Sequence, residues 1–140
     1  QLLKVAQEYG AEISGVDISS VAIDMAKQAL PKGNLHAANA EELPFDDNTF
    51  DYVTCLGSLE RMLDLEKVLR EQVRVTKDTA KFCFLVRNSE RISWKIVKNG
   101  LGIINKKGHQ GAKSMKEWTE IFSKGASARR LAAHPRQHQD

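Results

Sequence analysis

Residues 13–38 read ISGVDISSVAIDMAKQALPKGNLHAA, in which a short apolar stretch, a helical pattern and a second apolar stretch follow one another. The two apolar stretches, Ile13–Val16 and Leu35–Ala38, predict short strands. Between them, Ser19 and Ser20 are of the type that caps helix N-termini. The apolar side chains that follow recur on one broad face, until a proline and a glycine interrupt the pattern. This order predicts a strand–helix–strand unit.

The same alternation continues on both sides of this unit. A helix is predicted to be under way at the first residue and to end near Gly10, since glycine commonly ends helices. Phe50–Leu56 and Lys81–Arg87 are nearly continuous apolar stretches, which predicts strands covered on both faces. Asp64 caps a helix between them, and Met115–Lys124 predicts a last short helix. Strands that alternate with helices favour an α/β fold with a doubly wound, mostly parallel sheet.

A length of 140 residues corresponds to one ordinary domain, so residues 1–140 are expected to form a single domain. Residues 88–114 contain four glycines and no firm period, and we expect a mobile insertion that acts as a lid over a ligand site. Residues 126–140 predict an edge strand at Arg129–Ala133 and a frayed tail.

The composition excludes several classes of protein. Hydrophobic residues make up 41% and charged residues 28%, the balance of a globular chain. The longest apolar run, Phe82–Val86, is too short to span a membrane, and Gln1–Gly10 does not resemble a signal peptide. Two cysteines, Cys55 and Cys83, do not make a disulfide scaffold. We therefore expect a cytoplasmic protein without a membrane segment.

The net charge of +3 hides a division between the two halves of the chain. Residues 1–64 hold 4 Lys/Arg and 11 Asp/Glu, whereas residues 65–140 hold 17 and 7. This asymmetry indicates either a basic face for anions or nucleic acid, or complementarity between the halves. Nucleic acid is disfavoured because Trp94 is the only aromatic ring among the basic residues of 88–114.

The sequence does not predict a metal site. The four histidines show no ligand spacing; they are His36, His109, His134 and His138. Gly57-Ser58 is not a nucleophile elbow, because the second glycine is absent.

Ligands of parallel sheets bind at the carboxyl ends of the strands, so the residues just after strands are the candidates for a site. These residues are Asp17, Asn39, Gly57 and Arg87–Asn88. A carboxylate at Asp17 can accept hydrogen bonds from both hydroxyls of a ribose. Alternatively, it only caps the helix that follows.

Three ordered motifs give the chain a family resemblance. They are GVDIS at residues 15–19, NAEELPF at 39–45 and DNTFD at 47–51. With them, the chain from Gln1 to Phe122 resembles the class I S-adenosylmethionine-dependent methyltransferases, in particular the small-molecule group called methyltransferase type 11. The resemblance implies a Rossmann-like fold and a small-molecule methyl acceptor.

The resemblance also assigns residues to S-adenosylmethionine. It implies that Asp17 holds the ribose hydroxyls and that Ile18 packs on one face of the adenine. Asn39, where relatives carry Asp, would meet the adenine amino edge, with Ala40 beside it. Gly57 would let the backbone approach the methionine part of the cofactor.

The family's first strand and glycine-rich turn are expected just before Gln1 and are missing from these residues. The strands around Ile13 and Val53 normally flank that strand, so their exposed edges predict self-association. The leading hypothesis is a methyltransferase acting on a small molecule. The alternative is a non-catalytic, truncated module that binds a nucleoside or a partner. No catalytic residue is assigned, although Glu60 is a candidate base.

Overall fold

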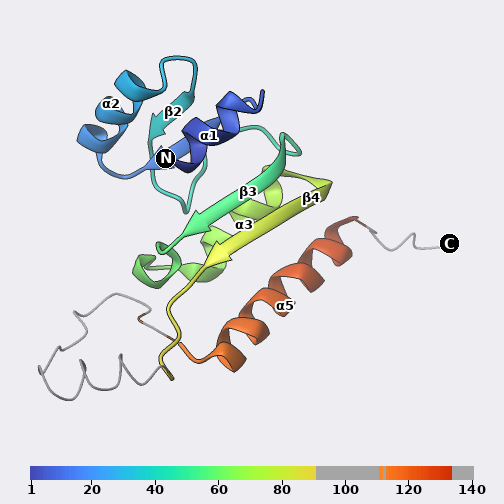
Figure 1. Ribbon diagram of the computed structural model, residues 1–140. Helices are drawn as coiled ribbons and strands as arrows, with labels where there is room; N and C mark the ends of the chain where they lie inside the picture. Colours follow the sequence, from blue (N-terminus) through green and yellow to red (C-terminus); the bar gives the residue numbers. More distant parts are fainter. Residues whose placement is uncertain (91–110, 112, 134–140) are drawn as a thin grey trace, which may run out of the picture. The chain divides into compact units, whose positions relative to one another are not determined.

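The computed structural model describes residues 1–90, 111 and 113–133, with side chains as far as Gly125. The chain divides into two compact units, residues 1–45 and 46–140. Each unit contains one pair of parallel strands, which confirms the predicted α/β class (Figure 1). Most of the expected lid at 88–114 lies outside the described residues.

The first unit is a strand–helix–strand motif preceded by a helix. Its elements are α1 (Leu2–Glu8), β1 (Ser14–Asp17), α2 (Ser20–Ala29) and β2 (Asn34–Ala37). Ser19 caps α2 as predicted, because its Oγ accepts the Ala22 N–H at 3.2 Å. The strands are displaced by one residue from their predicted positions. They pair with Asp17 opposite Ala37.

A small apolar core holds the first unit together. It consists of Ile13, Ile23, Leu30 and Leu35, with Leu3, Ala6 and Ala26 packed against it. A Cβ at Gly15 would lie 3.2 Å from the Leu35 side chain and 3.5 Å from that of Leu3. Both α1 and α2 therefore pack closely against this strand pair.

The second unit contains the other two strands and the longer helices. Its elements are β3 (Phe50–Leu56), the short 3₁₀ helix η1 (Leu59–Arg61), α3 (Leu65–Arg74), β4 (Thr76–Leu85) and α5 (Met115–Ala133). Asp64 caps α3 as predicted, since its Oδ1 accepts the Lys67 N–H at 2.9 Å. β4 begins five residues before the predicted Lys81. The register slips near its start, where a Lys77–Asp51 ion pair of 3.0 Å joins the strands.

Both helices of the second unit cover the same face of the β3–β4 pair. α5 packs on β4 through a row of aromatic rings. The ring centroid of Phe122 lies 4.7 Å from that of Phe84 and 5.7 Å from that of Trp118, and both pairs are stacked. In the strand register Phe84 lies opposite Cys55, and the Cys55 thiol lies near the Gln72 side chain of α3. The covered face therefore joins α3, the strands and α5.

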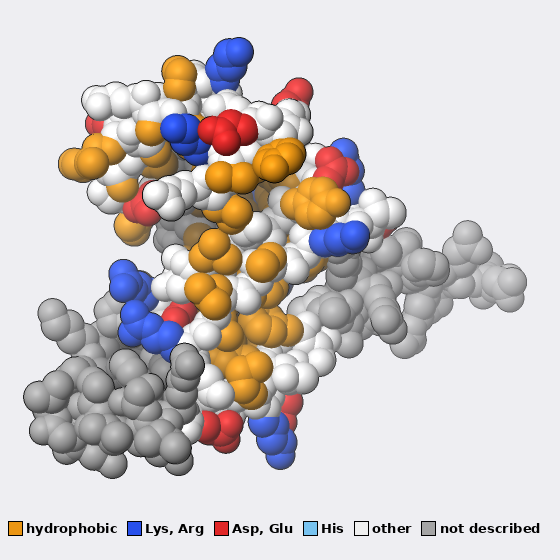
Figure 2. All heavy atoms as spheres, in the orientation of Figure 1, with side chains coloured by type: hydrophobic (Ala, Val, Ile, Leu, Met, Phe, Trp, Pro, Cys, Tyr) orange, Lys and Arg blue, Asp and Glu red, His pale blue; other side chains and the backbone are white. Residues whose placement is uncertain are grey.

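The opposite face of this strand pair is exposed. Tyr52 and Leu85 are 69% and 62% exposed, and Figure 2 shows hydrophobic side chains over the region of β3 and β4. Within the second unit, therefore, the helices cover only one face of these strands, and the prediction of strands covered on both faces is wrong for this unit taken by itself. The apolar pattern identified the strands, but it does not say which face a helix covers.

The predicted edge strand at Arg129–Ala133 is also wrong. α5 continues through Ala133, and its C-terminal residues, rich in Ala, Arg and Leu, have high helix propensity. Its first turn is fixed by a capping box. Ser114 Oγ accepts the Glu117 N–H at 3.2 Å, and Glu117 Oε2 accepts the Ser114 N–H at 2.7 Å.

We expect the two thiols to react at very different rates. Cys83 is exposed, whereas burial raises the pKa of the Cys55 thiol and so disfavours its thiolate. Iodoacetamide at mildly alkaline pH should label Cys83 at least about tenfold faster than Cys55, as measured by mass spectrometry. In urea the two rates should converge, which serves as the control. Equal rates in the native chain would contradict this placement of Cys55.

Candidate ligand edge of the first strand pair

The clearest candidate site is the carboxyl edge of β1 and β2, which brings Asp17 and Asn39 together. The Ala38 N–H donates to the Asp17 carbonyl at 3.0 Å, so the chain leaving β2 stays beside the end of β1. Asn39 is the next residue. The sequence predicted this juxtaposition from the strand order alone.

The Asp17 side chain has one oxygen in a local turn. Its Oδ1 accepts the Ser19 N–H at 2.9 Å, which is the helix-start role considered above. Among the described residues Oδ2 has no hydrogen-bond partner, and the residue is exposed. The capping role therefore leaves this carboxylate with acceptor capacity for a ligand hydroxyl.

The Asn39 side chain has the same arrangement. Its Oδ1 accepts the Glu41 N–H at 3.0 Å, and the residue is exposed. A carbonyl oxygen has two lone pairs, so Oδ1 can accept one further donor while the side-chain amide remains a donor. Asp17 and Asn39 thus present a carboxylate and an amide at one strand edge.

Ile18 and Ala40 flank these two polar side chains. Ile18 is 81% exposed, unusually high for a large aliphatic residue, whereas Ala40 is partly buried. An exposed isoleucine beside two hydrogen-bonding side chains suits a ligand with both an apolar ring and polar edges.

Gly57 belongs to the second unit and follows the carboxyl end of β3. Its φ of +70° is a left-handed conformation that favours glycine, and a Cβ there would meet nothing within 4 Å. Its N–H donates to the Leu85 carbonyl at 2.8 Å, which joins it to the end of β4. The backbone turn alone therefore accounts for the glycine, and the open space leaves room for a ligand.

Glu60, the candidate base, is almost completely buried. Only 5% of the residue is exposed, and its Oε1 accepts the Arg87 N–H at 3.2 Å. A base needs to reach the proton that it removes. The structure therefore does not support Glu60 as a solvent-facing base.

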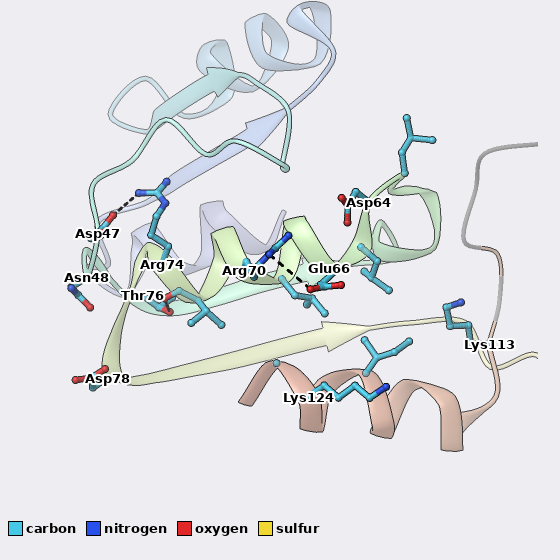
Figure 3. Close-up of a pocket in the computed structure, with 16 residues that line it drawn as sticks. Asp47, Asn48, Asp64, Glu66, Arg70, Arg74, Thr76, Asp78, Lys113 and Lys124 are labelled. Carbon is cyan, nitrogen blue, oxygen red and sulfur yellow. Dashed lines mark hydrogen bonds and ion pairs between the residues drawn. The ribbon is translucent and has the colours of Figure 1, made fainter. Parts of the chain in front are cut away.

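A separate groove lies between α3 and α5 and does not include the predicted cofactor residues (Figure 3). It has a volume of about 1240 Å³. Leu65, Leu69 and Val73 contribute to its lining, and at one end Arg74 pairs with Asp47 at 2.7 Å. Arg74 also pairs with Glu71 at 2.8 Å, and the two carboxylates raise the pKa of its guanidinium. This network ties the turn before β3 to the C-terminus of α3.

Neither a membrane-spanning helix nor a metal-binding cluster occurs among the described residues. No helix in that part of the chain is long and apolar enough to cross a membrane. Nor do its His, Cys, Asp and Glu residues include a cluster of three or more suited to a metal ion.

Comparisons with known proteins agree with this fold. The chain is 34% identical over 105 residues to a demethylmenaquinone methyltransferase of Listeria welshimeri, covering 69% of this chain and 44% of the relative. It is 38% identical over 94 residues to a ubiquinone/menaquinone biosynthesis C-methyltransferase of Rickettsia bellii, covering 61% and 38%. The chain thus spans less than half the length of these relatives.

A solved structure, the YcgJ protein of Bacillus subtilis, superposes with a TM-score of 0.63 at 28% identity, covering 81% of this chain and 51% of that one. The structural neighbours include class I methyltransferases, so the fold is Rossmann-like. Residues 1–84 match the family described as Methyltransferase domain. The chain therefore belongs to the class I methyltransferase family.

Proposed function

We propose that this chain is part of an enzyme that transfers a methyl group from S-adenosylmethionine to a small-molecule acceptor of the quinone type. The observation that carries the proposal is the pair of exposed side chains, Asp17 and Asn39, at the carboxyl edge of β1 and β2. The names of the relatives support the acceptor class, since one refers to demethylmenaquinone and the other to ubiquinone and menaquinone biosynthesis. A cytoplasmic location remains a prediction.

The side chains at this edge suit the polar groups of an adenosine. Asp17 would accept hydrogen bonds from ribose hydroxyls through its unpartnered oxygen, and Asn39 would accept from the adenine amino group. Ile18 would cover one face of the adenine, and Ala40 would lie at the ring edge. Gly57 would leave room for the methionine part.

Methyl transfer from S-adenosylmethionine requires few reactive groups from the protein side chains. When bound, S-adenosylmethionine supplies an electrophilic methyl group on a sulfonium. The residues of this chain would hold the adenosine, orient it and help to exclude water, and these effects account for most of the catalysis in such reactions. No proton-transfer residue is assigned, and buried Glu60 is not proposed for that role.

The test is methyl transfer by a longer chain in which a strand and a glycine-rich turn precede Gln1. With tritium-labelled S-adenosylmethionine and a demethylated naphthoquinol, we expect labelled product above the level without protein. The alternative, a non-catalytic nucleoside-binding module, predicts cofactor binding without product. That outcome with a folded protein would overturn the enzymatic proposal.

We also propose that the chain self-associates through its strand edges. Among the described strands β1 pairs only with β2, and β3 only with β4, so both outer edges of each pair are unpaired there. Unpaired backbone groups along such an edge are a template for another strand.

Sedimentation velocity tests this association. We expect the chain to show concentration-dependent oligomers, and Tyr52→Lys on exposed β3 to shift them towards monomer, because an edge lysine opposes strand pairing. Tyr9→Lys, at an 89% exposed residue of the first unit, is the control and should have no effect. A clean monomer of the unmodified chain would refute self-association.

A further inference from the structure

Glu60 lies where three segments of the second unit meet. It belongs to η1, directly after β3 and Gly57. Its Oε1 accepts the Arg87 N–H at 3.2 Å and lies 3.6 Å from the Arg87 Nε, so it binds the chain leaving β4. Its backbone carbonyl accepts the Gly111 N–H at 3.1 Å, which attaches a third segment ahead of α5.

The connection continues into the core through Trp118. The indole Nε1–H donates to the Arg87 carbonyl at 3.1 Å, and Trp118 is 1% exposed. Both backbone polar groups of Arg87 are therefore hydrogen-bonded, the N–H to Glu60 and the carbonyl to Trp118. The Arg87 side chain remains 55% exposed at the end of the strand pair.

The second oxygen of Glu60 gives this arrangement an unfavourable contribution to the free energy of folding. Oε2 is buried and has no hydrogen-bond partner within the described parts of the chain. A buried carboxylate with an unsatisfied oxygen is unfavourable compared with an apolar side chain of similar size. Stability alone would favour a residue such as methionine here.

We propose that Glu60 is a positioning residue that fixes the carboxyl ends of β3 and β4 relative to each other. It sets the turn that contains Gly57 and orients Arg87, at the strand ends where ligands of parallel sheets bind. The proposal rests on the proposed function in treating these strand ends as part of a ligand site, but its test needs no cofactor.

The test combines amide hydrogen exchange by NMR with thermal unfolding of the 140-residue chain. We expect Glu60→Met to speed exchange of the Arg87 amide by at least about tenfold, because it removes the acceptor. Exchange at Gly111 should also rise, whereas amides in the middle of β3 and β4 keep their protection. Glu60→Gln retains an oxygen acceptor and should partly rescue Arg87.

The melting temperature separates positioning from a structural role. A positioning carboxylate predicts that Glu60→Met melts at the same or a higher temperature than the unmodified chain. The control is Glu66→Gln, an exposed glutamate on α3 that pairs with Arg70 at 3.9 Å, and neither readout should change. Two results would overturn the proposal: unchanged Arg87 exchange in Glu60→Met, or a lower melting temperature with faster exchange throughout the second unit.

Discussion

Trp118→Ala is expected to lower the free energy of unfolding of the second unit by about 3–5 kcal/mol, the usual cost of removing a buried large aromatic side chain. Trp118 is 1% exposed, stacks on Phe122 at 5.7 Å, and donates its indole N–H to the Arg87 carbonyl. Alanine would leave a cavity between α5 and the strands and would remove the hydrogen bond to the Arg87 carbonyl. Urea denaturation followed by circular dichroism measures the loss.

Two further variants make this measurement specific. Trp118→Phe keeps an aromatic ring and removes the N–H, so a loss of about 1–2 kcal/mol is expected from the hydrogen bond and the smaller ring. Lys116→Ala, on the exposed side of the same helix, should change stability by less than about 0.5 kcal/mol. A loss below about 1 kcal/mol for Trp118→Ala would show that α5 does not depend on this contact.

The second large effect concerns cofactor affinity. Asp17→Ala is expected to weaken binding of S-adenosylhomocysteine by at least about tenfold, since hydrogen bonds to a charged group contribute about 1.5–3 kcal/mol each. Calorimetry on the longer chain, with the strand and glycine-rich turn ahead of Gln1, is the measurement.

The same variant also tests the capping role of Asp17. Its Oδ1 accepts the Ser19 N–H at 2.9 Å, so a purely structural residue would lower the melting temperature and leave affinity unchanged. Asp24→Ala is the matched control, because Asp24 is exposed on α2 of the same unit. Equal affinities for the Asp17→Ala and Asp24→Ala variants would remove Asp17 from the cofactor site.

Local signals in the sequence predicted the helix starts well. Ser19 and Asp64 both cap helices through hydrogen bonds to backbone N–H groups, as their residue types indicate. The end of the last helix was predicted less well, because Arg129–Ala133 carries no periodic pattern. At these residues helix propensity determines the secondary structure, and α5 ends at Ala133.

The start of β4 and the burial of Glu60 were not predicted from the sequence, because both involve residues far apart in the chain. The first five residues of β4, Thr76–Ala80, are mostly polar; Thr76 lies opposite Phe50 of β3, and Lys77 forms an ion pair with Asp51. Glu60 looks like a surface residue in the sequence, yet its partner Arg87 lies 27 positions away. Neither contact leaves a local signature.

The part of the candidate site that could be predicted is its position at one strand edge, because this position follows from the parallel topology alone. Consecutive parallel strands place Asp17 and Asn39 at one edge, and the Ala38 N–H to Asp17 carbonyl bond confirms that placement. The sequence could not show that each side chain also closes a local turn, because the turns at Ser19 and Glu41 depend on backbone geometry.

The most direct test of the central claim is an NMR titration of the 140-residue chain with S-adenosylmethionine, with the backbone amide signals assigned. Without the glycine-rich turn we expect weak binding, with a dissociation constant of the order of millimolar, which a titration to about 10 mM detects. Shift changes should be centred on residues 17–20 and 39–41, and should saturate. Changes confined to the α3–α5 groove, or no change at about 10 mM, would contradict the assignment of the cofactor to the Asp17–Asn39 edge.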